Sequence, residues 1–106
     1  MARTMRILVM FDLPVSNSMA RREYTSFHKF LIKDGYDMIQ YSIYGRITRN
    51  HDDTKKHIIR LRHNLPSRGA VRAMTVTEKQ YNAMVVLVGP VTATENFLSP
   101  RELIEI

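Results

Sequence analysis

The sequence predicts a small α+β domain in which strands and helices alternate along the chain. Of its 106 residues, 44% are hydrophobic and 25% are charged, proportions that are ordinary for one folded globular domain. Continuous apolar runs around Val9 and Val86 are typical of strands, and two stretches between them repeat with the period of helices. One sheet covered by helices is the simplest arrangement of these elements.

The first strand is expected from Arg6 to Phe11, a run rich in branched residues that is typical of a strand buried on both faces. Pro14 ends it, because proline donates no ladder hydrogen bond. Residues 16–18 can cap a helix that Asp34-Gly35 closes. This helix has one apolar stripe and one polar, mostly basic stripe. The apolar stripe consists of Ala20, Tyr24, Phe27 and Leu31, and the polar stripe of Arg22, Ser26, Lys29 and Lys33.

Apolar and polar residues alternate from Ile39 to Tyr44, the period of a half-buried strand, although the pattern leaves open how residues 36–49 divide. A second helix follows, with Asp52 or Asp53 as its cap. We expect Ile58, Leu61 and Leu65 to face inward in this helix, and Lys56, Arg60 and His63 to face outward.

Beyond a turn at residues 66–69, the sequence predicts a strand from Val71 to Val76 and a short helical piece from Glu78 to Tyr81. Met84 to Val88 is expected to be a second buried strand, and Leu103 to Ile106 a short edge strand. The order strand, helix, strand, strand, helix, strand describes a ferredoxin-like βαββαβ sandwich with an extra C-terminal edge strand. Residues 1–90 would form this domain, and residues 91–106 a tail that docks on a partner.

The predicted sheet has one face that its own helices do not cover. Two short helices protect a single face, whereas strands as apolar as those around Val9 and Val86 require burial on both. A second copy of the chain is the simplest cover, so we expect a homodimer. The apolar segment Leu103 to Ile106 is suited to pair with a neighbour's sheet edge.

The charge is unevenly distributed. The net charge is +6, and between Thr54 and Thr77 there are six basic residues and no acidic one. From Val91 onward the balance reverses, with three glutamates against Arg101. This pattern favours a polyanionic partner, most simply nucleic acid, for the body of the chain and a different partner for the tail. A solvated charged surface is the alternative.

No apolar run approaches the length of a membrane span, and residues 1–4 lead directly into a strand rather than a signal peptide. The absence of cysteine excludes disulfides and thiolate metal sites. We therefore expect a cytoplasmic protein. The four histidines lack metal-ligand spacing and are predicted to be surface residues.

Asp12, which follows the first strand, is the one serious candidate for a catalytic and metal-binding residue. A carboxylate in so basic a chain can hold Mg²⁺ against phosphate. The alternative is an Asx turn before Pro14, and for a single copy this alternative is favoured. A twofold axis near the loop would bring two Asp12 carboxylates together, which with water molecules can hold one ion.

Arginines form the predicted nucleic-acid-binding set. Arg21 and Arg22 lie near the N-terminus of the first helix, and Arg46 and Arg49 follow the strand at Tyr44. Their guanidinium groups suit phosphate oxygens, although a solvated helix face would look the same. A small-molecule sensor is disfavoured, because the chain has a basic bias and no glycine-rich ligand turn.

Three segments of the chain resemble the CRISPR-associated protein Cas2 family. They are a first strand that ends in an aromatic residue and Asp, a helix with early arginines, and a strand of the form Q-x-S-[VI]-[FY]. The form Phe11-Asp12-Leu13-Pro14 is similar to members from type II systems. The segments are Met5 to Pro14, Arg21 to Tyr24 and Gln40 to Arg46.

The resemblance implies a ferredoxin-like homodimer with its metal-binding aspartate at Asp12, and a metal-dependent phosphodiesterase activity that some members show on RNA and others on DNA. It also implies an architectural role in spacer acquisition. There the dimer bridges two dimers of the integrase subunit, Cas1, and lays a basic surface along the protospacer duplex. The helix arginines of the family correspond to Arg21 and Arg22. We favour the bridging role, with Mg²⁺-dependent endonuclease activity as the alternative.

Overall fold

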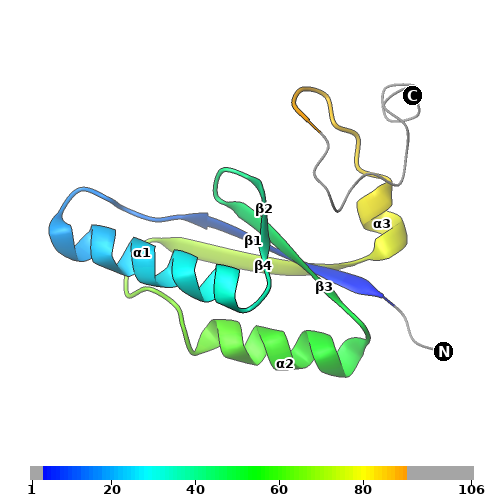
Figure 1. The fold of residues 1–106 in the computed structure, drawn as a ribbon, viewed down its shortest axis with the longest axis horizontal. Coiled ribbons are helices and arrows are strands. Elements are labelled where there is room, and N and C mark those ends of the chain that lie inside the picture. Colours follow the sequence, from blue (N-terminus) through cyan, green and yellow to red (C-terminus); the bar gives the residue numbers. More distant parts are fainter. Residues whose placement is uncertain (1–3, 91–106) are drawn as a thin grey trace.

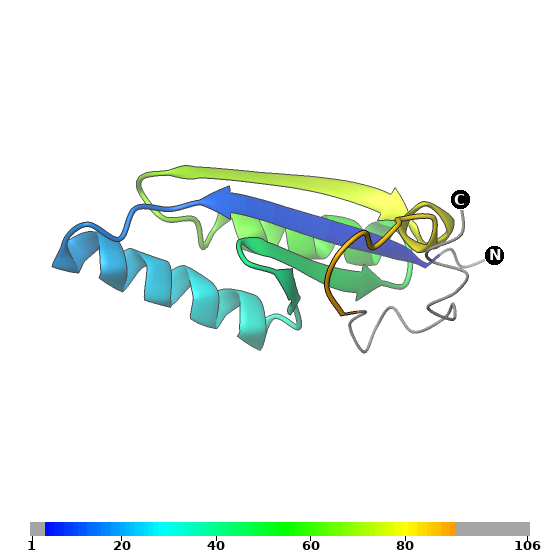
Figure 2. The same ribbon diagram turned by 90° about the horizontal axis from the view of Figure 1, so that it is seen from above.

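The structure, a computed structural model, describes residues 4–90, which form a four-stranded antiparallel sheet with two long helices packed on one face (Figure 1). The order across the sheet is β2-β3-β1-β4, and Figure 2 shows β1 and β4 running side by side. The α+β class and the βαββαβ order of a ferredoxin-like sandwich are confirmed. The strands are β1 (Met5–Asp12), β2 (Asp37–Gln40), β3 (Ile43–Thr48) and β4 (Ala70–Thr77), and the helices are α1 (Ser18–Lys33), α2 (His51–Arg62) and α3 (Glu78–Asn82).

The core lies between the sheet and the two long helices. Ile7, Val9 and Phe11 alternate along β1 and point into this layer, where the Phe11 ring meets the rings of Phe27 and Tyr44 at centroid distances of 5.4 and 5.6 Å. The residues of β1 between them face the other side of the sheet and are only partly buried. The prediction of burial on both faces is therefore wrong for a single copy, because neither long helix reaches the second face.

Helix α1 begins and ends as its sequence predicts. The side chain of Asn17 accepts a hydrogen bond from the amide of Ala20 at 2.8 Å, which satisfies one of the free amides of the first turn. At the other end Gly35 has φ +91°, a left-handed conformation that glycine adopts without strain. Leu31 and Phe27 of the predicted apolar stripe are buried in the core.

The stretch from residue 36 to residue 49 divides into a hairpin. Tyr41 and Ser42 form its turn, with Ser42 at φ +65°, and the amide of Phe11 donates to the Ser42 carbonyl at 3.0 Å. The alternation through Tyr41 therefore does not belong to one strand, and the Tyr41 side chain is 88% exposed at the tip. Inside β3, a Cβ on Gly45 would lie 2.8 Å from Ile39 Cδ1, the far end of a side chain, so any larger residue there requires Ile39 to shift.

Helix α2 differs from the prediction in its cap and in its buried face. Asn50, not Asp52 or Asp53, is the N-cap, and its side chain accepts from the Asp53 amide at 2.8 Å. The buried residues are Asp53, Thr54, His57 and Leu61, whereas Leu65 lies beyond the helix and is exposed. Hydrophobicity alone did not predict this buried face, because most of its residues are polar. These polar residues can be buried since they are paired with one another and with neighbouring elements.

The chain after β4 follows the prediction at first and then departs from it. Helix α3 forms where a helical piece was expected, and Arg6 on β1 holds it through Glu78 at 2.7 Å. Met84 to Val88 is not a strand, and Leu87 and Val88 are 81% and 95% exposed. A strand needs a hydrogen-bonded neighbour, and within residues 4–90 this segment has none. The predicted edge strand at Leu103 to Ile106 and the rest of the predicted tail, residues 91–106, lie outside the described residues.

No helix within residues 4–90 is both long and apolar enough to span a membrane.

Candidate functional site

Asp12 lies exposed at the end of β1, on the sheet face opposite the helices. Its neighbour Phe11 points into the core, and successive side chains of a strand alternate between faces. The backbone at this point is tightly constrained, since a Cβ on Gly69 would lie 2.7 Å from the Asp12 carbonyl oxygen. Gly69, at φ +91°, thus lets the loop before β4 pass directly against the end of β1.

The Asp12 carboxylate has no hydrogen bond or ion pair within residues 4–90, so the Asx turn considered above is not formed. Nor do the described residues contain a group of three or more acidic or histidine side chains that could hold a metal ion. Mg²⁺ is commonly bound by one or two carboxylates, with water and substrate phosphates as the other ligands. One copy of the chain supplies one such carboxylate, and a second copy would supply the other.

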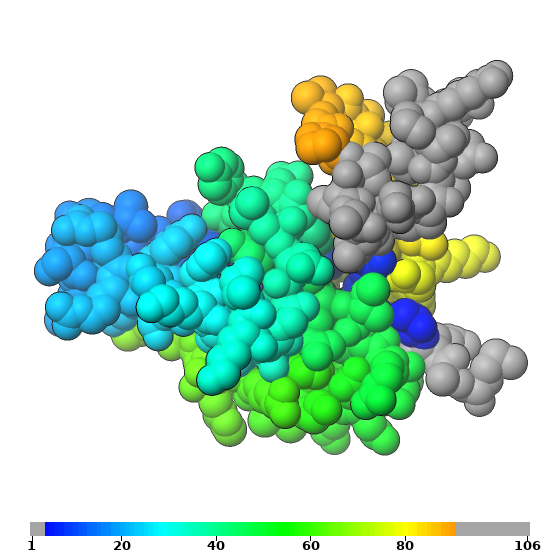
Figure 3. Space-filling view, in the orientation of Figure 1, coloured from blue at the N-terminus to red at the C-terminus, as the bar shows by residue number. Residues whose placement is uncertain are grey.

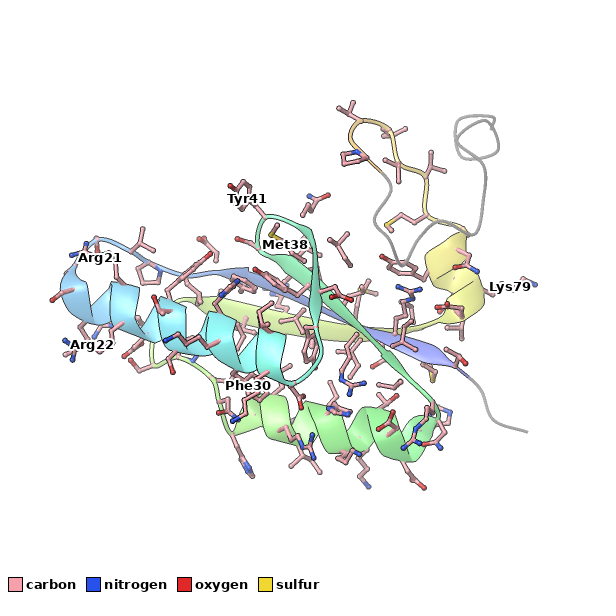
Figure 4. The ribbon with its side chains drawn as sticks, viewed as in Figure 1. Arg21, Arg22, Phe30, Met38, Tyr41 and Lys79 are labelled. Atoms are coloured by element: carbon pink, nitrogen blue, oxygen red, sulfur yellow. The ribbon has the colours of Figure 1, made fainter. Side chains whose placement is uncertain are left out.

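The exposed face of α1 is cationic along its length. Arg21 and Arg22 at its beginning are exposed, and Figure 4 shows both at the same end of the molecule. The one acid of the helix, Glu23, is turned to the loop before β4 and accepts hydrogen bonds from the hydroxyl and amide of Ser67 at 2.6 and 3.0 Å. These bonds lower the pKa of Glu23. The exposed positions of α1 therefore carry Arg21, Arg22, Lys29 and Lys33, and no carboxylate.

The structure does not bring the four predicted arginines together. Arg46 is half-buried, and its Nε and Nη1 donate to the carbonyls of Asp34 and Ile47 at 2.6 and 2.7 Å. Arg49 follows Thr48, which pairs with Met5 at the start of β1, so it lies at the end of the sheet away from Arg21 and Arg22. It is 81% exposed and 3.8 Å from Asp53. Arg49 is therefore open to solvent, whereas Arg46 is largely occupied by the protein.

A buried polar cluster was missed by the sequence reasoning. The His57 ring nitrogens lie 2.8 Å from an Asp34 oxygen and 3.4 Å from an Asp53 oxygen, and Arg60 lies 2.9 Å from the second Asp34 oxygen. The pKa of Asp53 is lowered, and the largest cause is the hydrogen bond that its carboxylate accepts from the Arg49 amide. The prediction that His57 is a surface residue is thus wrong. Its spacing from Asp53 is a helical i, i+4 pair visible in the sequence, but its contact with Asp34 comes from the fold. The cluster links α2 to the end of α1.

A groove runs between α1 and α2, with a volume of about 630 Å³. Figure 3 shows the side chains of the two helices, cyan and green, next to each other on one face of the molecule. Ser26 and Lys29 line this groove and also a shallower hollow beside Arg21 and Arg22. The groove is therefore continuous with the cationic face of α1.

Comparison with known proteins places the chain in a family. The sequence profile of CRISPR associated protein Cas2 matches residues 5–84. Three relatives bear the name CRISPR-associated endoribonuclease Cas2. The protein from Acidovorax ebreus is 59% identical, over 80% of this chain and 83% of its own length. Those from Ligilactobacillus salivarius and Streptococcus mutans are 46% and 39% identical, over 80% of this chain and 84% and 78% of their lengths. The fold, the match over most of the domain and these identities together show that the chain belongs to the CRISPR-associated Cas2 family.

Proposed function

We propose that the protein is a subunit of the CRISPR spacer-acquisition complex, in which a homodimer of this chain binds protospacer duplex DNA and bridges dimers of the integrase subunit, Cas1. The observation that carries this proposal is the face of α1, where every exposed charged residue is a cation. Phosphate contacts position a protein on nucleic acid without reading its sequence, which suits a complex that accepts many different protospacers.

The length of this surface fits a nucleic-acid backbone. From Arg22 to Lys33 the helix rises about 17 Å, which equals the rise of about five base pairs along a duplex axis. The cations of a single α1 can thus meet more than one phosphate of a duplex. Arg49 would extend the basic surface at the other end of the sheet.

The dimer is proposed from the sheet face that the helices leave open. Leu8 and Met10 of β1 lie on this face, and Met74, directly opposite Leu8, is 48% exposed. Ile47 on the neighbouring strand is 42% exposed. Contiguous exposed apolar side chains mark interaction surfaces, and a second copy would cover them.

Equilibrium binding to a labelled duplex, measured by fluorescence anisotropy over a range of salt concentrations, tests the DNA-binding role. Each phosphate contact contributes about 0.9 to the slope of log affinity against log salt. We expect the double variant Arg21→Gln, Arg22→Gln to lower that slope by about 1.8 and to bind all sequences more weakly.

The matched control is Lys55→Gln, Lys79→Gln, which removes the same charge away from α1; Figure 4 shows Lys79 at the opposite end of the molecule from Arg21 and Arg22. We expect a smaller loss from this variant. Equal losses of affinity in the two double variants would show that only the net charge matters, which would contradict the assignment of α1 as the interface.

A second candidate function is Mg²⁺-dependent cleavage of RNA or DNA, in which Asp12 from both copies would hold the ion. Two observations favour it: the Asp12 carboxylate is exposed and unpaired within residues 4–90, and the relatives are named endoribonucleases. Asp12→Asn keeps the shape of the side chain and removes its charge. We expect this variant to lose Mg²⁺-dependent cleavage while DNA binding stays intact. Cleavage that survives the substitution rules out this assignment.

A further inference from the structure

The groove between α1 and α2 has a charge that its own side chains do not neutralise. Its cations are Lys29, Lys33 and Arg60, and Asp34 is its acid. Both oxygens of Asp34 are already used, one by Arg60 at 2.9 Å and the other by His57 at 2.8 Å. Neither lysine has an ion pair within residues 4–90. The two ammonium groups are therefore available to an anion.

The groove also contains an aromatic ring. Phe30 is half-buried, packs against the core on one side and lines the groove on the other. Cations beside an aromatic surface are the combination by which proteins bind single-stranded nucleic acid, with phosphates on the charges and bases against the rings. In a duplex the base faces are covered by their stacked neighbours, so only an unpaired base can lie against Phe30.

The size and position of the groove agree with such a ligand. Its volume of about 630 Å³ is within the range of small-molecule sites. Because Ser26 and Lys29 line both the groove and the hollow beside Arg21 and Arg22, a strand that follows α1 can enter it without leaving the basic surface. Asp12 lies on the opposite face of the sheet, so binding in the groove is separate from any cleavage there.

We propose that this groove holds an unpaired nucleotide, with its phosphate between Lys29 and Lys33 and its base against Phe30. The proposal rests on the nucleic-acid-binding role proposed above and deepens it. The α1 surface takes the backbone of a duplex, and the groove takes a nucleotide of a single-stranded extension.

Anisotropy with two labelled DNAs tests the proposal: a blunt duplex, and the same duplex with an unpaired oligothymidine extension. We expect the extension to tighten binding by the full-length protein. In Phe30→Leu, which keeps an apolar side chain, this gain should fall about fivefold or more while blunt-duplex affinity stays unchanged. Stacking is not ionic, so the salt slope of Phe30→Leu should match that of the parent protein. Lys29→Gln, Lys33→Gln should lose the gain and also lower the slope.

The control Lys55→Gln, Lys79→Gln should retain the gain. Circular dichroism is the measurement that checks whether the Phe30→Leu variant is folded. A crosslink from a 5-iodouracil extension to Phe30 of the unmodified protein gives a readout that needs no variant. The proposal is overturned if the extension adds nothing, if both groove variants retain its effect, or if the crosslink maps outside the groove.

The two proposals fail differently. If Arg21→Gln, Arg22→Gln leaves blunt-duplex binding unchanged, the α1 interface is wrong. Binding of free oligothymidine, and its sensitivity to Phe30→Leu, still decides the groove.

Discussion

The hydroxyl of Tyr36 provides a test of how completely the core satisfies its polar atoms. Tyr36 is 1% exposed, and within residues 4–90 its hydroxyl has no hydrogen-bond partner. Burial, and then the nearby Asp34 carboxylate, raise the pKa of Tyr36 to about 12. The substitution Tyr36→Phe removes only this oxygen and leaves the ring that fills the core.

We expect Tyr36→Phe to stabilise the protein. A buried polar group without a partner costs about 1–3 kcal/mol of desolvation, and the unfolded chain, whose phenol is hydrated, does not bear this cost. The free energy of unfolding should therefore rise by about 1–3 kcal/mol. For a domain of this size, each kcal/mol raises Tm by about 4 °C or more.

Urea denaturation and thermal melting, at one fixed protein concentration because association would shift both, measure the change. Tyr41→Phe is the matched control. Its side chain is 88% exposed, so its hydroxyl is hydrated in both states and stability should not change. Destabilisation by Tyr36→Phe would show that the hydroxyl has a partner in the folded protein, which would refute the reasoning.

The pH dependence gives Tyr36 a second signature. A group whose pKa is higher in the folded state contributes stability below its unfolded pKa, and this is lost as the pH rises through the folded value. The parent protein should lose stability between pH 10.0, the ordinary pKa of a tyrosine phenol, and about pH 12, the raised pKa of Tyr36. Tyr36→Phe should lack this part of the alkaline loss. If the two proteins have the same profile from pH 10 upward, Tyr36 does not titrate as proposed.

Two further predictions concern buried charges. Glu78→Ala leaves the guanidinium of Arg6, 4% exposed, without the carboxylate now at 2.7 Å. Breaking a buried pair costs about 3–5 kcal/mol, and because Glu78 is 33% exposed we expect about 2 kcal/mol in urea denaturation. Folding lowers the pKa of the Asp53 carboxyl. The ionised carboxylate therefore contributes to stability above pH 3.8, the ordinary pKa of this group, and the contribution is lost as the pH falls below that value. Asp53→Asn should flatten the stability profile in this acid range.

Each of these two predictions would be contradicted by a specific measurement. A Glu78→Ala protein within about 0.5 kcal/mol of the parent, the range of an ordinary surface substitution, would mean that Arg6 is stabilised without Glu78. An Asp53→Asn protein that loses stability with acid as steeply as the parent would place the acid sensitivity in other carboxylates.

Local sequence signals were sufficient for elements whose caps and periodicity lie within a few residues. The helix from Ser18 to Lys33 follows from its capping residues, its apolar stripe and Gly35, all of which act over one or two turns. The strand ending at Asp12 follows from its branched residues. The basic face of α1 was also predictable, because side chains opposite an apolar stripe point to solvent.

Features that depend on distant partners could not be predicted. Met84 to Val88 has the composition of a strand, yet composition does not supply the neighbouring strand that a ladder requires. His57 is polar and was assigned to the surface, whereas Asp34, far away in the sequence, makes its burial possible. The turn at Ser42 is stabilised by the amide of Phe11, again from a distant element.

The sequence by itself determined the fold class, the family resemblance, the position of Asp12 after its strand and the cations of the first helix. The family resemblance is carried by the residues of three short motifs, and the other features by composition or by the order and periodicity of residues along a short stretch of chain. Only the tertiary structure decided that Asp12 faces away from the helices without a partner within residues 4–90, that Arg46 is bound to backbone carbonyls, and that two helices enclose a basic groove beside Phe30. These depend on which distant residues come into contact, and contact between distant elements is set by packing rather than by local pattern.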